Sequence, residues 1–154
     1  MGELISDFEL EQAIGLNVNR TAFLMTEEIA KRFAQLGYAM SAQDFGILLR
    51  LSKYGSMTQN AIAGLLMRDK TTITRRIDGL VKKDLVKRTP DTKDKRYFQV
   101  SLTEKGEQAL EATIPLVRDF QEEVLSDISD KDKAITIQTL KYIADKLIKA
   151  RSDI

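Results

Sequence analysis

Two short apolar segments separated by only three residues constrain the fold of this chain more than any other feature. The first segment is QNAIAGLL after Thr58, and the second is KTTITRRIDGLVKK after Asp69. Threonine and aspartate are typical helix N-caps, and apolar residues spaced by three and four predict amphipathic helices. The residues expected to face inward are Ile62, Leu65 and Leu66 in the first helix and Ile73, Ile77, Leu80 and Val81 in the second. A short helix, a tight turn and a longer helix are therefore expected here.

The segments before this pair also predict helices. Residues 8–36 have apolar side chains at spacings of three and four without a proline, so we expect one long helix that ends at Gly37. Ser41 and Asp44 form a capping-box pattern for a second helix that reaches about Lys53. The apolar face predicted for this second helix includes Phe45, Leu48, Leu49 and Leu51.

Two strands and two further helices are expected after the pair. Residues 85–88 (LVKR) and 97–102 (YFQVSL) favour strands, so the loop between them is the tip of a hairpin. A helix should begin at Thr103, and Pro115 is expected to kink or divide it because proline removes a helical hydrogen bond. Residues 129–132 resemble a capping box for a last helix. The apolar residues of that last helix are Ile135, Leu140, Ile143, Leu147 and Ile148.

The charge is distributed unevenly along the chain. The formal net charge is +1, yet residues 50–105 hold 14 Lys and Arg against 6 Asp and Glu, a net of +8. This leaves 10 of the 24 basic and 17 of the 23 acidic side chains for the rest of the chain, a net of −7. A concentrated basic surface suits a phosphate backbone, although a solvated face without a partner is the commoner use of a charged run.

The composition excludes several classes of site. The 154 residues include neither cysteine nor histidine, so thiol chemistry, a Ser-His-Asp triad and the usual zinc, iron or copper ligands are missing. We therefore expect no enzyme activity, no metal and no cofactor. No run of about 18 apolar residues occurs, and the acidic N-terminus MGELISDFELE is unlike a signal peptide. A cytoplasmic protein that does not enter a membrane is expected.

The order of these elements describes a DNA-binding architecture. A short helix, a three-residue turn and a helix with a basic outer face form a helix-turn-helix, and the basic hairpin that follows forms a wing. The expected fold class is mainly α with a small β-hairpin wing. The wing tip PDTKDKR can reach the minor groove while the second helix of the pair lies in the major groove. Double-stranded DNA is therefore the expected partner.

Residues 58–106 resemble the MarR family of bacterial transcriptional regulators. IAGLLMRDKTTITRRIDGL fits the family pattern of Leu-Ala, a turn, Asp-Lys-Ser-Thr-Val-Thr-Arg and a closing Asp-x-Leu; DKR and SLTEKG match the wing and the next helix. Three positions depart from the family pattern. Met67 replaces a frequent Gly, and Arg68 replaces a frequent apolar residue. Asp84 replaces the Gly that usually closes the recognition helix, so we expect Asp84 in the left-handed conformation.

The resemblance also implies how the rest of the chain is used. Residues 1–36 would form an N-terminal dimerisation helix, 37–106 the winged helix-turn-helix lobe, and 107–154 the C-terminal dimerisation helices. A homodimer would act as a repressor on a pseudo-palindromic operator, with recognition helices about 34 Å apart. The apolar residues expected to join the two copies are Ile14, Val18, Met25, Leu140, Ile143 and Leu147.

The helix faces and the resemblance together assign the site residues. DNA contacts are expected from Gln59, Arg68, Lys70, Thr71, Thr72, Thr74 and Arg75 and from the wing residues Lys93, Lys95 and Arg96. Asp69 and Asp94 are alternative partners for Arg96 that would orient the wing. Arg76 and Lys82 are equally well explained as solvated residues or as residues that pack by their stems within the protein. Members of the family respond to small aromatic or phenolic anions. The residues expected around such an effector are Tyr38, Met40, Phe45 and Arg50.

One alternative function stays open from the sequence. A winged helix can bind another protein instead of DNA, and its recognition face would then carry exposed apolar or acidic residues. The face predicted here is basic. Strong salt dependence of duplex binding would distinguish the two functions.

Overall fold

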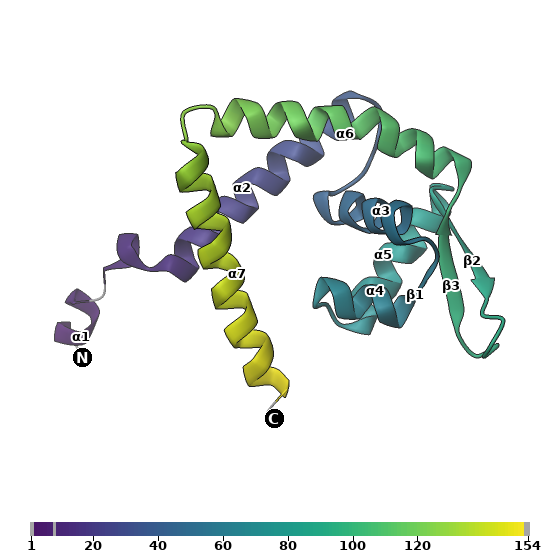
Figure 1. Cartoon of the computed structure of the whole chain (residues 1–154), viewed down its shortest axis with the longest axis horizontal. Helices are drawn as coiled ribbons and strands as arrows, with labels where there is room; N and C mark the ends of the chain where they lie inside the picture. Colours follow the sequence, from purple (N-terminus) through teal and green to yellow (C-terminus); the bar gives the residue numbers. More distant parts are fainter. Residues whose placement is uncertain (1, 8, 153–154) are drawn as a thin grey trace. The chain divides into compact units, whose positions relative to one another are not determined.

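The computed structural model describes residues 2–7 and 9–152 (Figure 1). The chain divides into two units, Met1–Val117 and Arg118–Ile154. The elements in chain order are α1 (Gly2–Ser6), the 3-10 helix η1 (Leu10–Gln12), α2 (Ile14–Gln35), α3 (Ala42–Tyr54), β1 (Met57–Thr58), α4 (Gln59–Leu66), α5 (Lys70–Lys82), β2 (Val86–Pro90), β3 (Phe98–Leu102), α6 (Glu104–Leu125) and α7 (Asp130–Ser152). The predicted fold class, mainly α with a small hairpin, is confirmed.

The first long helix, α2, begins later than the sequence pattern predicts. The predicted start at Phe8 lies outside the described residues, and η1 and an extended Ala13 (φ −73°, ψ 107°) precede α2. The side-chain amide of Asn17 donates to the carbonyls of Glu11 and Ala13, both at 2.9 Å, and the Asn17 N–H also donates to the Ala13 carbonyl at 3.1 Å. The prediction of one uninterrupted helix is therefore wrong.

The predicted helix ends and caps are confirmed around α2, α3 and α4. Gly37 has φ +93° just after α2, a conformation that suits glycine. Ser41 and Asp44 form the reciprocal capping box of α3, with both N–H to oxygen distances at 3.0 Å. The Thr58 hydroxyl accepts from the Ala61 N–H at 3.1 Å and caps α4.

Two non-glycine residues adopt left-handed backbone conformations at the ends of the helical pair. Asp84 has φ +59° after α5, as predicted. Met67 has φ +53° after α4, where the family often has Gly, and the next N–H, that of Arg68, donates to the Ala63 carbonyl at 3.0 Å. The turn thus keeps its hydrogen bonding despite the conformational cost of a methionine at this position.

The core of the first unit forms beneath the helical pair. Ile73, Ile77 and Leu80 of α5 are 0–1% exposed, as their spacing predicts. Three residues predicted to face inward are instead 37–50% exposed: Leu49, Leu65 and Val81. Each of these three precedes or follows a better-buried residue, and neighbouring positions on a helix differ by about 100° in direction. Two residues not named in the prediction, Ile47 and Ala63, are buried.

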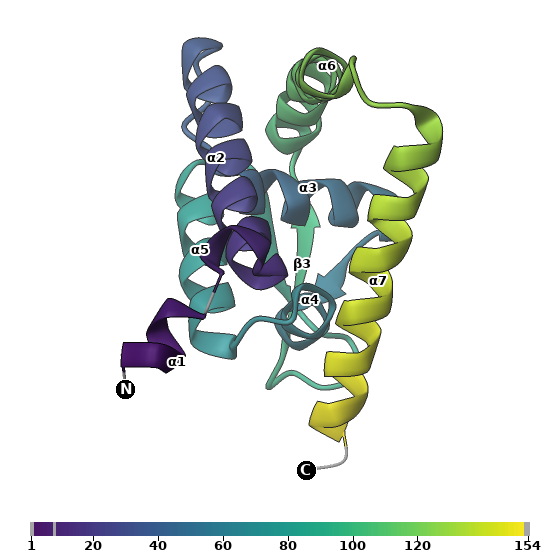
Figure 2. The same cartoon turned by 90° about the vertical axis from the view of Figure 1, so that its left-hand side faces the viewer.

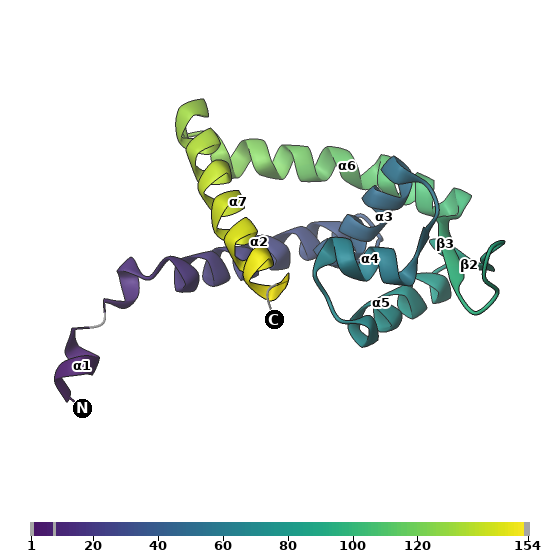
Figure 3. The same ribbon diagram turned by 60° about the horizontal axis from the view of Figure 1, so that its bottom comes forward.

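The sheet has three antiparallel strands in the order β1-β3-β2. β3 lies against α3 and α4 (Figure 2), and β2 and β3 form the wing hairpin that projects from the lobe (Figure 3). Val100 of β3 pairs with Met57 on one side and Arg88 on the other, and it is fully buried. The two-residue strand β1 was not predicted, because it lies directly before the cap of α4 and has no periodic pattern of its own.

The prediction for the helix after Thr103 allowed either a kink or a division at Pro115. α6 continues through Pro115 without division. Pro115 and Glu111, whose carbonyl loses its helical donor, are both exposed, so water can satisfy that carbonyl. In α7 the Ser129 hydroxyl accepts from the Asp132 N–H at 3.1 Å, as the cap pattern predicts. The apolar side chains of α7 that are at least 40% exposed are Ile135, Ile137, Leu140, Tyr142, Leu147 and Ile148.

Gly106 in the first turn of α6 should be essential for the stability of the lobe. A Cβ at this position would lie 2.1 Å from the Leu85 carbonyl oxygen, a backbone atom that cannot turn aside. Gly106→Ala should therefore lower the free energy of unfolding by about 1–3 kcal/mol in urea denaturation. Gly64→Ala is the matched control, because Gly64 lies within α4 with open space around it, and alanine should stabilise that helix by about 0.5–1 kcal/mol. Equal stability of the two variants would contradict the close approach at Gly106.

Candidate nucleic-acid interface

The first turn of α5 is fixed by Asp69. Its carboxylate accepts from the Thr72 N–H at 2.8 Å and from the Thr72 hydroxyl at 2.7 Å. These bonds, the backbone one first, hold the pKa of Asp69 below its ordinary value. Asp69 therefore caps the helix and also orients Thr72. Its predicted alternative role, pairing with Arg96, is not the contact that the structure records for it.

The outer face of α5 presents basic and small polar side chains. Lys70, Thr71 and Arg75 are exposed, while Thr74 is half-buried. The Thr74 hydroxyl donates to the Lys70 carbonyl at 2.8 Å and accepts from the side-chain amide of Gln59 at 3.2 Å. Among the five α5 residues predicted to contact DNA, Thr72 and Thr74 thus have hydrogen-bond partners within the protein.

Arg88 of β2 connects α4, α5 and the wing. Its Nε donates to Gln59 Oε1 at 2.7 Å, and its Nη2 lies 2.6 Å from Asp78 Oδ1 of α5. Arg88 is not among the residues predicted from the sequence to form the site. Strand alternation could have found it, because Arg88 lies on the same side of β2 as the buried Val86 and so needs a polar partner.

Arg76 of α5 turns away from the outer face and binds the start of α3. Its Nη1 donates to the Ser41 hydroxyl at 3.0 Å and lies 3.5 Å from Asp44 Oδ1. The capping box of α3 therefore also receives the guanidinium of α5. The choice left open for Arg76 resolves in favour of an internal contact.

The wing tip holds its basic residues by short-range contacts. Arg96 makes a two-point contact with Asp94, with Nη2 to Oδ2 at 2.7 Å and Nε to Oδ1 at 3.0 Å. This pairing lowers the pKa of Asp94 and raises that of Arg96. The Arg96 side chain nevertheless stays 82% exposed, and its guanidinium lies 5.8 Å from the Tyr97 ring centroid. Lys93 and Lys95 are also exposed.

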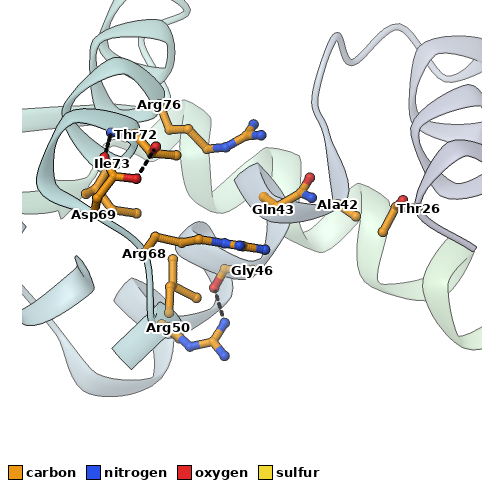
Figure 4. Close-up of a pocket in the computed structure, with 11 residues that line it drawn as sticks. Thr26, Ala42, Gln43, Gly46, Arg50, Arg68, Asp69, Thr72, Ile73 and Arg76 are labelled. Atoms are coloured by element: carbon orange, nitrogen blue, oxygen red, sulfur yellow. Dashed lines mark hydrogen bonds between the residues drawn. The ribbon is translucent and has the colours of Figure 1, made fainter. Parts of the chain in front are cut away.

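A cavity of about 400 Å³ lies between α3 and the start of α5 (Figure 4). Arg50, Arg68 and Arg76 line it together with Asp69 and Thr72, and the Arg50 guanidinium donates to the Gly46 carbonyl at 3.0 Å. Figure 4 shows Arg68 and Arg76 extending toward α3. Basic groups therefore predominate among the charged side chains around this space.

Of the four residues expected around an effector, only Arg50 is among those that line this cavity. Met40 is 4% exposed in the core, and Tyr38 is half-buried. The Phe45 ring packs against Phe33, with 5.6 Å between the ring centroids. Arg68, which is expected to contact DNA, also lines this cavity.

Two further classes of site are absent from the described parts of the chain. Residues 2–7 and 9–152 contain no group of three or more Asp, Glu, His or Cys side chains placed to hold a metal ion. Within the same ranges, no helix combines the length and the apolar character needed to cross a bilayer.

Residues 40–98 match the MarR family model. YwoH of Bacillus subtilis (strain 168), an uncharacterized HTH-type transcriptional regulator, is 30% identical over 116 residues, covering 75% of this chain and 82% of YwoH. The chain belongs to the MarR family. YwaE of the same strain, also uncharacterized, is 30% identical over 110 residues, which cover 71% of this chain but only 64% of YwaE. The HTH-type transcriptional regulator PecS of Dickeya dadantii (strain 3937) is 24% identical over 149 residues, covering 94% of this chain and 89% of PecS.

Solved structures confirm the MarR fold over nearly the whole chain. S. aureus MepR in complex with DNA superposes with a TM-score of 0.77 at 20% identity, covering 90% of this chain and 99% of MepR. The organohalide-sensing regulator RdhR bound to 2,4-dichlorophenol gives 0.82 at 17% identity, covering 92% of this chain and 83% of RdhR. The matched relatives are transcriptional regulators, which confirms the predicted class and the prediction that this chain is not an enzyme.

The pH dependence of stability tests the Asp69 cap. Because folding lowers the pKa of Asp69, its ionised form stabilises the native state above the ordinary pKa, and this stabilisation is lost as the pH falls through the lower folded pKa. Asp69→Ala should unfold at a lower temperature than wild type at pH 7, and the difference should narrow in acid.

Two variants control this measurement of thermal unfolding. Asp69→Asn keeps a cap acceptor without the charge. It should therefore keep most of the wild-type stability at pH 7 and lose less stability than wild type in acid. Asp127→Ala removes an exposed carboxylate from the turn after α6 and should show little effect. If the unfolding temperatures of Asp69→Ala and wild type differ by the same amount at every pH, the ionised carboxylate does not stabilise the fold.

Proposed function

We propose that this MarR-family chain is a repressor that binds double-stranded DNA sequence-specifically as a homodimer on a pseudo-palindromic operator. The observation that carries the proposal is the outer face of α5, where Lys70, Thr71 and Arg75 are exposed above a fully buried apolar stripe. A helix held rigidly on one side and basic on the other suits the major groove. The DNA-bound state of MepR supports this use of the shared fold.

The residues divide into base-reading and backbone-binding roles. Arg75 can bind guanine at two points, and Thr71 can contact a thymine methyl group or a phosphate. Lys70 and the wing residues Lys93 and Lys95 neutralise phosphates. Arg96 reaches into the minor groove from a loop that Asp94 holds in shape, because its guanidinium stays exposed while it is paired.

We also propose that a small aromatic or phenolic anion controls DNA binding from the cavity beside α5. Arg50, Arg68 and Arg76 supply positive charge there, and the capped start of α5 forms part of the wall. RdhR with bound 2,4-dichlorophenol supports a ligand of this class. A ligand that displaced the Arg76 contacts to Ser41 and Asp44 would alter how α5 is held.

The terminal helices form the dimer in this proposal. Residues 1–36 and 107–154 would join the two copies, and 37–106 would hold the DNA-binding lobe. Large apolar side chains on α2 and α7 are exposed in the single chain, as an interface that needs a second copy requires: Ile14, Leu16, Val18, Phe23, Leu24, Leu140 and Leu147.

Substitutions in α7 test the dimer without disturbing the lobe. Leu140 and Leu147 lie seven residues apart on one face of α7 and are 42% and 63% exposed. The double variant Leu140→Lys with Leu147→Lys should shift sedimentation at micromolar concentration from dimer to monomer. Gln138→Lys, on the opposite face of the helix, is the control and should remain dimeric. A wild-type chain that is a well-folded monomer at this concentration would refute the proposal.

Selection of bound duplexes from a random-sequence pool with the full-length chain tests the DNA-binding function. The recovered duplexes should share a palindrome, and for about 6–10 phosphate contacts the affinity should fall roughly a thousandfold or more between 50 and 200 mM salt. Arg75→Ala should cost about 1–3 kcal/mol and relax the preference at one base pair in each half-site. Lys141→Ala removes an equal charge from α7 as the control. Recovery of no common sequence, or salt-independent binding, would favour the protein-binding alternative.

A further inference from the structure

We infer that Arg88 and Gln59 are positioning residues of the DNA-binding surface, which act through Asp78 and Thr74 to fix the recognition helix α5 relative to the wing. This role differs from the phosphate contact expected of Gln59. The inference rests on the proposed function, because its readout is sequence-specific DNA binding.

The four side chains form one continuous chain of hydrogen bonds. From α5, Asp78 Oδ1 accepts from Arg88 Nη2 at 2.6 Å. Arg88 Nε then donates to Gln59 Oε1 at 2.7 Å, and Gln59 Nε2 donates to Thr74 Oγ1 at 3.2 Å. The path therefore leaves α5 at Asp78, crosses β2 and the start of α4, and returns to α5 one turn earlier.

The hydrogen bonds that Thr74 and Gln59 make within the protein leave few donors for a direct phosphate contact. Phosphate oxygens only accept hydrogen bonds, and the single hydroxyl hydrogen of Thr74 is donated to the Lys70 carbonyl. Both ends of the Gln59 amide are in use, so its side chain is held in one orientation. These two residues consequently support the neighbours that do face outward.

The burial of the two arginines of the hairpin separates their roles. The Arg88 side chain is 23% exposed, whereas that of Arg96 at the tip is 82% exposed. Arg88 also lies opposite Val100, which is fully buried at the centre of the sheet. A guanidinium held at the base of the wing and bound to two elements fixes their spacing, and only a fixed spacing lets α5 and the wing enter adjacent grooves together.

The two possible roles of Asp78 predict opposite changes in DNA affinity. Asp78 is 52% exposed on the helix that faces DNA, so its negative charge opposes phosphate binding by simple electrostatics. If Asp78 acts only through its charge, Asp78→Asn should strengthen binding to every duplex. If Asp78 positions Arg88, the same substitution should weaken binding to the selected palindrome and leave random duplex unchanged or slightly tighter.

The experiment measures the affinity of the full-length chain for the palindrome selected by wild type and for a random duplex of equal length. Asp78→Asn and Arg88→Lys should each lower affinity for the palindrome about tenfold, a loss of about 1.4 kcal/mol of binding free energy. Lysine keeps the charge of Arg88 but cannot bind Gln59 and Asp78 together, so charge alone should not rescue binding. Glu104→Gln, which removes an exposed carboxylate from α6, is the matched control and should not weaken either complex.

Salt dependence and a double-mutant cycle complete the test. Arg88→Gln, which removes the charge, separates the two roles by salt dependence. Loss of a direct phosphate contact would reduce the salt slope by about 0.9, whereas loss of a positioning bond should leave the slope at the wild-type value. Gln59→Ala combined with Arg88→Lys should lose little more affinity than the worse single variant. Thermal unfolding and random-duplex binding confirm that each variant is folded.

The outcomes distinguish failure of the proposed function from failure of the positioning role. If wild type binds no palindrome, the proposed function fails. If wild type binds but Asp78→Asn and Arg88→Lys bind the palindrome as well as wild type or better, the positioning role is wrong. Additive losses in the double variant, or a reduced salt slope for Arg88→Gln, would likewise replace positioning with independent contacts.

Discussion

The burial of one side of α5 determines which side chains this helix exposes on the surface of the lobe. Ile73, Ile77 and Leu80 are removed from water almost completely, and each such side chain contributes about 1.5–3 kcal/mol of transfer free energy. Because a helix has a fixed pitch, this burial also decides which side chains face outward. The exposure of Lys70, Thr71 and Arg75 is therefore a consequence of core packing and needs no separate mechanism.

Adjacent basic residues in the lobe serve opposite purposes because of this geometry. Arg75 and Arg76 differ by about 100° around α5, so Arg75 is exposed while Arg76 binds Ser41 and Asp44 of α3. The net charge of a segment thus overstates the charge available to a ligand. Part of the basic surplus between residues 50 and 105 is used in holding α5 against its neighbours, and the rest gives the outer face and the wing tip their positive potential.

Local patterns in the sequence were enough to predict most of the lobe. The caps at Ser41, Thr58 and Asp69 depend on residues three positions apart, so the sequence shows both partners of each cap. Strand alternation marks Arg88 as an inward-facing residue, but it could not show its partner Gln59, which is 29 residues distant. The start of α2 was missed for a related reason, since the spacing of apolar residues does not show that the Asn17 side chain binds the Glu11 carbonyl, six residues earlier. Periodicity shows which face a helix can bury but not where competing polar bonds end it.

The two ends of α2 are used differently, and this links the proposed dimer to the DNA-binding lobe. Ile29 and Phe33 near its C-terminus are buried in the lobe core, whereas Ile14, Val18 and Phe23 near its start are exposed. At 1.5 Å per residue the helix is roughly 33 Å long, and a rigid helix of this length transmits a rotation at one end to the other. Phe33 packs on Phe45 of α3, the helix whose capping box holds Arg76 of α5. A change at the exposed end of α2, where the proposed dimer would form, would therefore reach α5 through packed side chains and one arginine. The proposed dimer contacts and the proposed DNA-reading face are thus linked by continuous side-chain contacts.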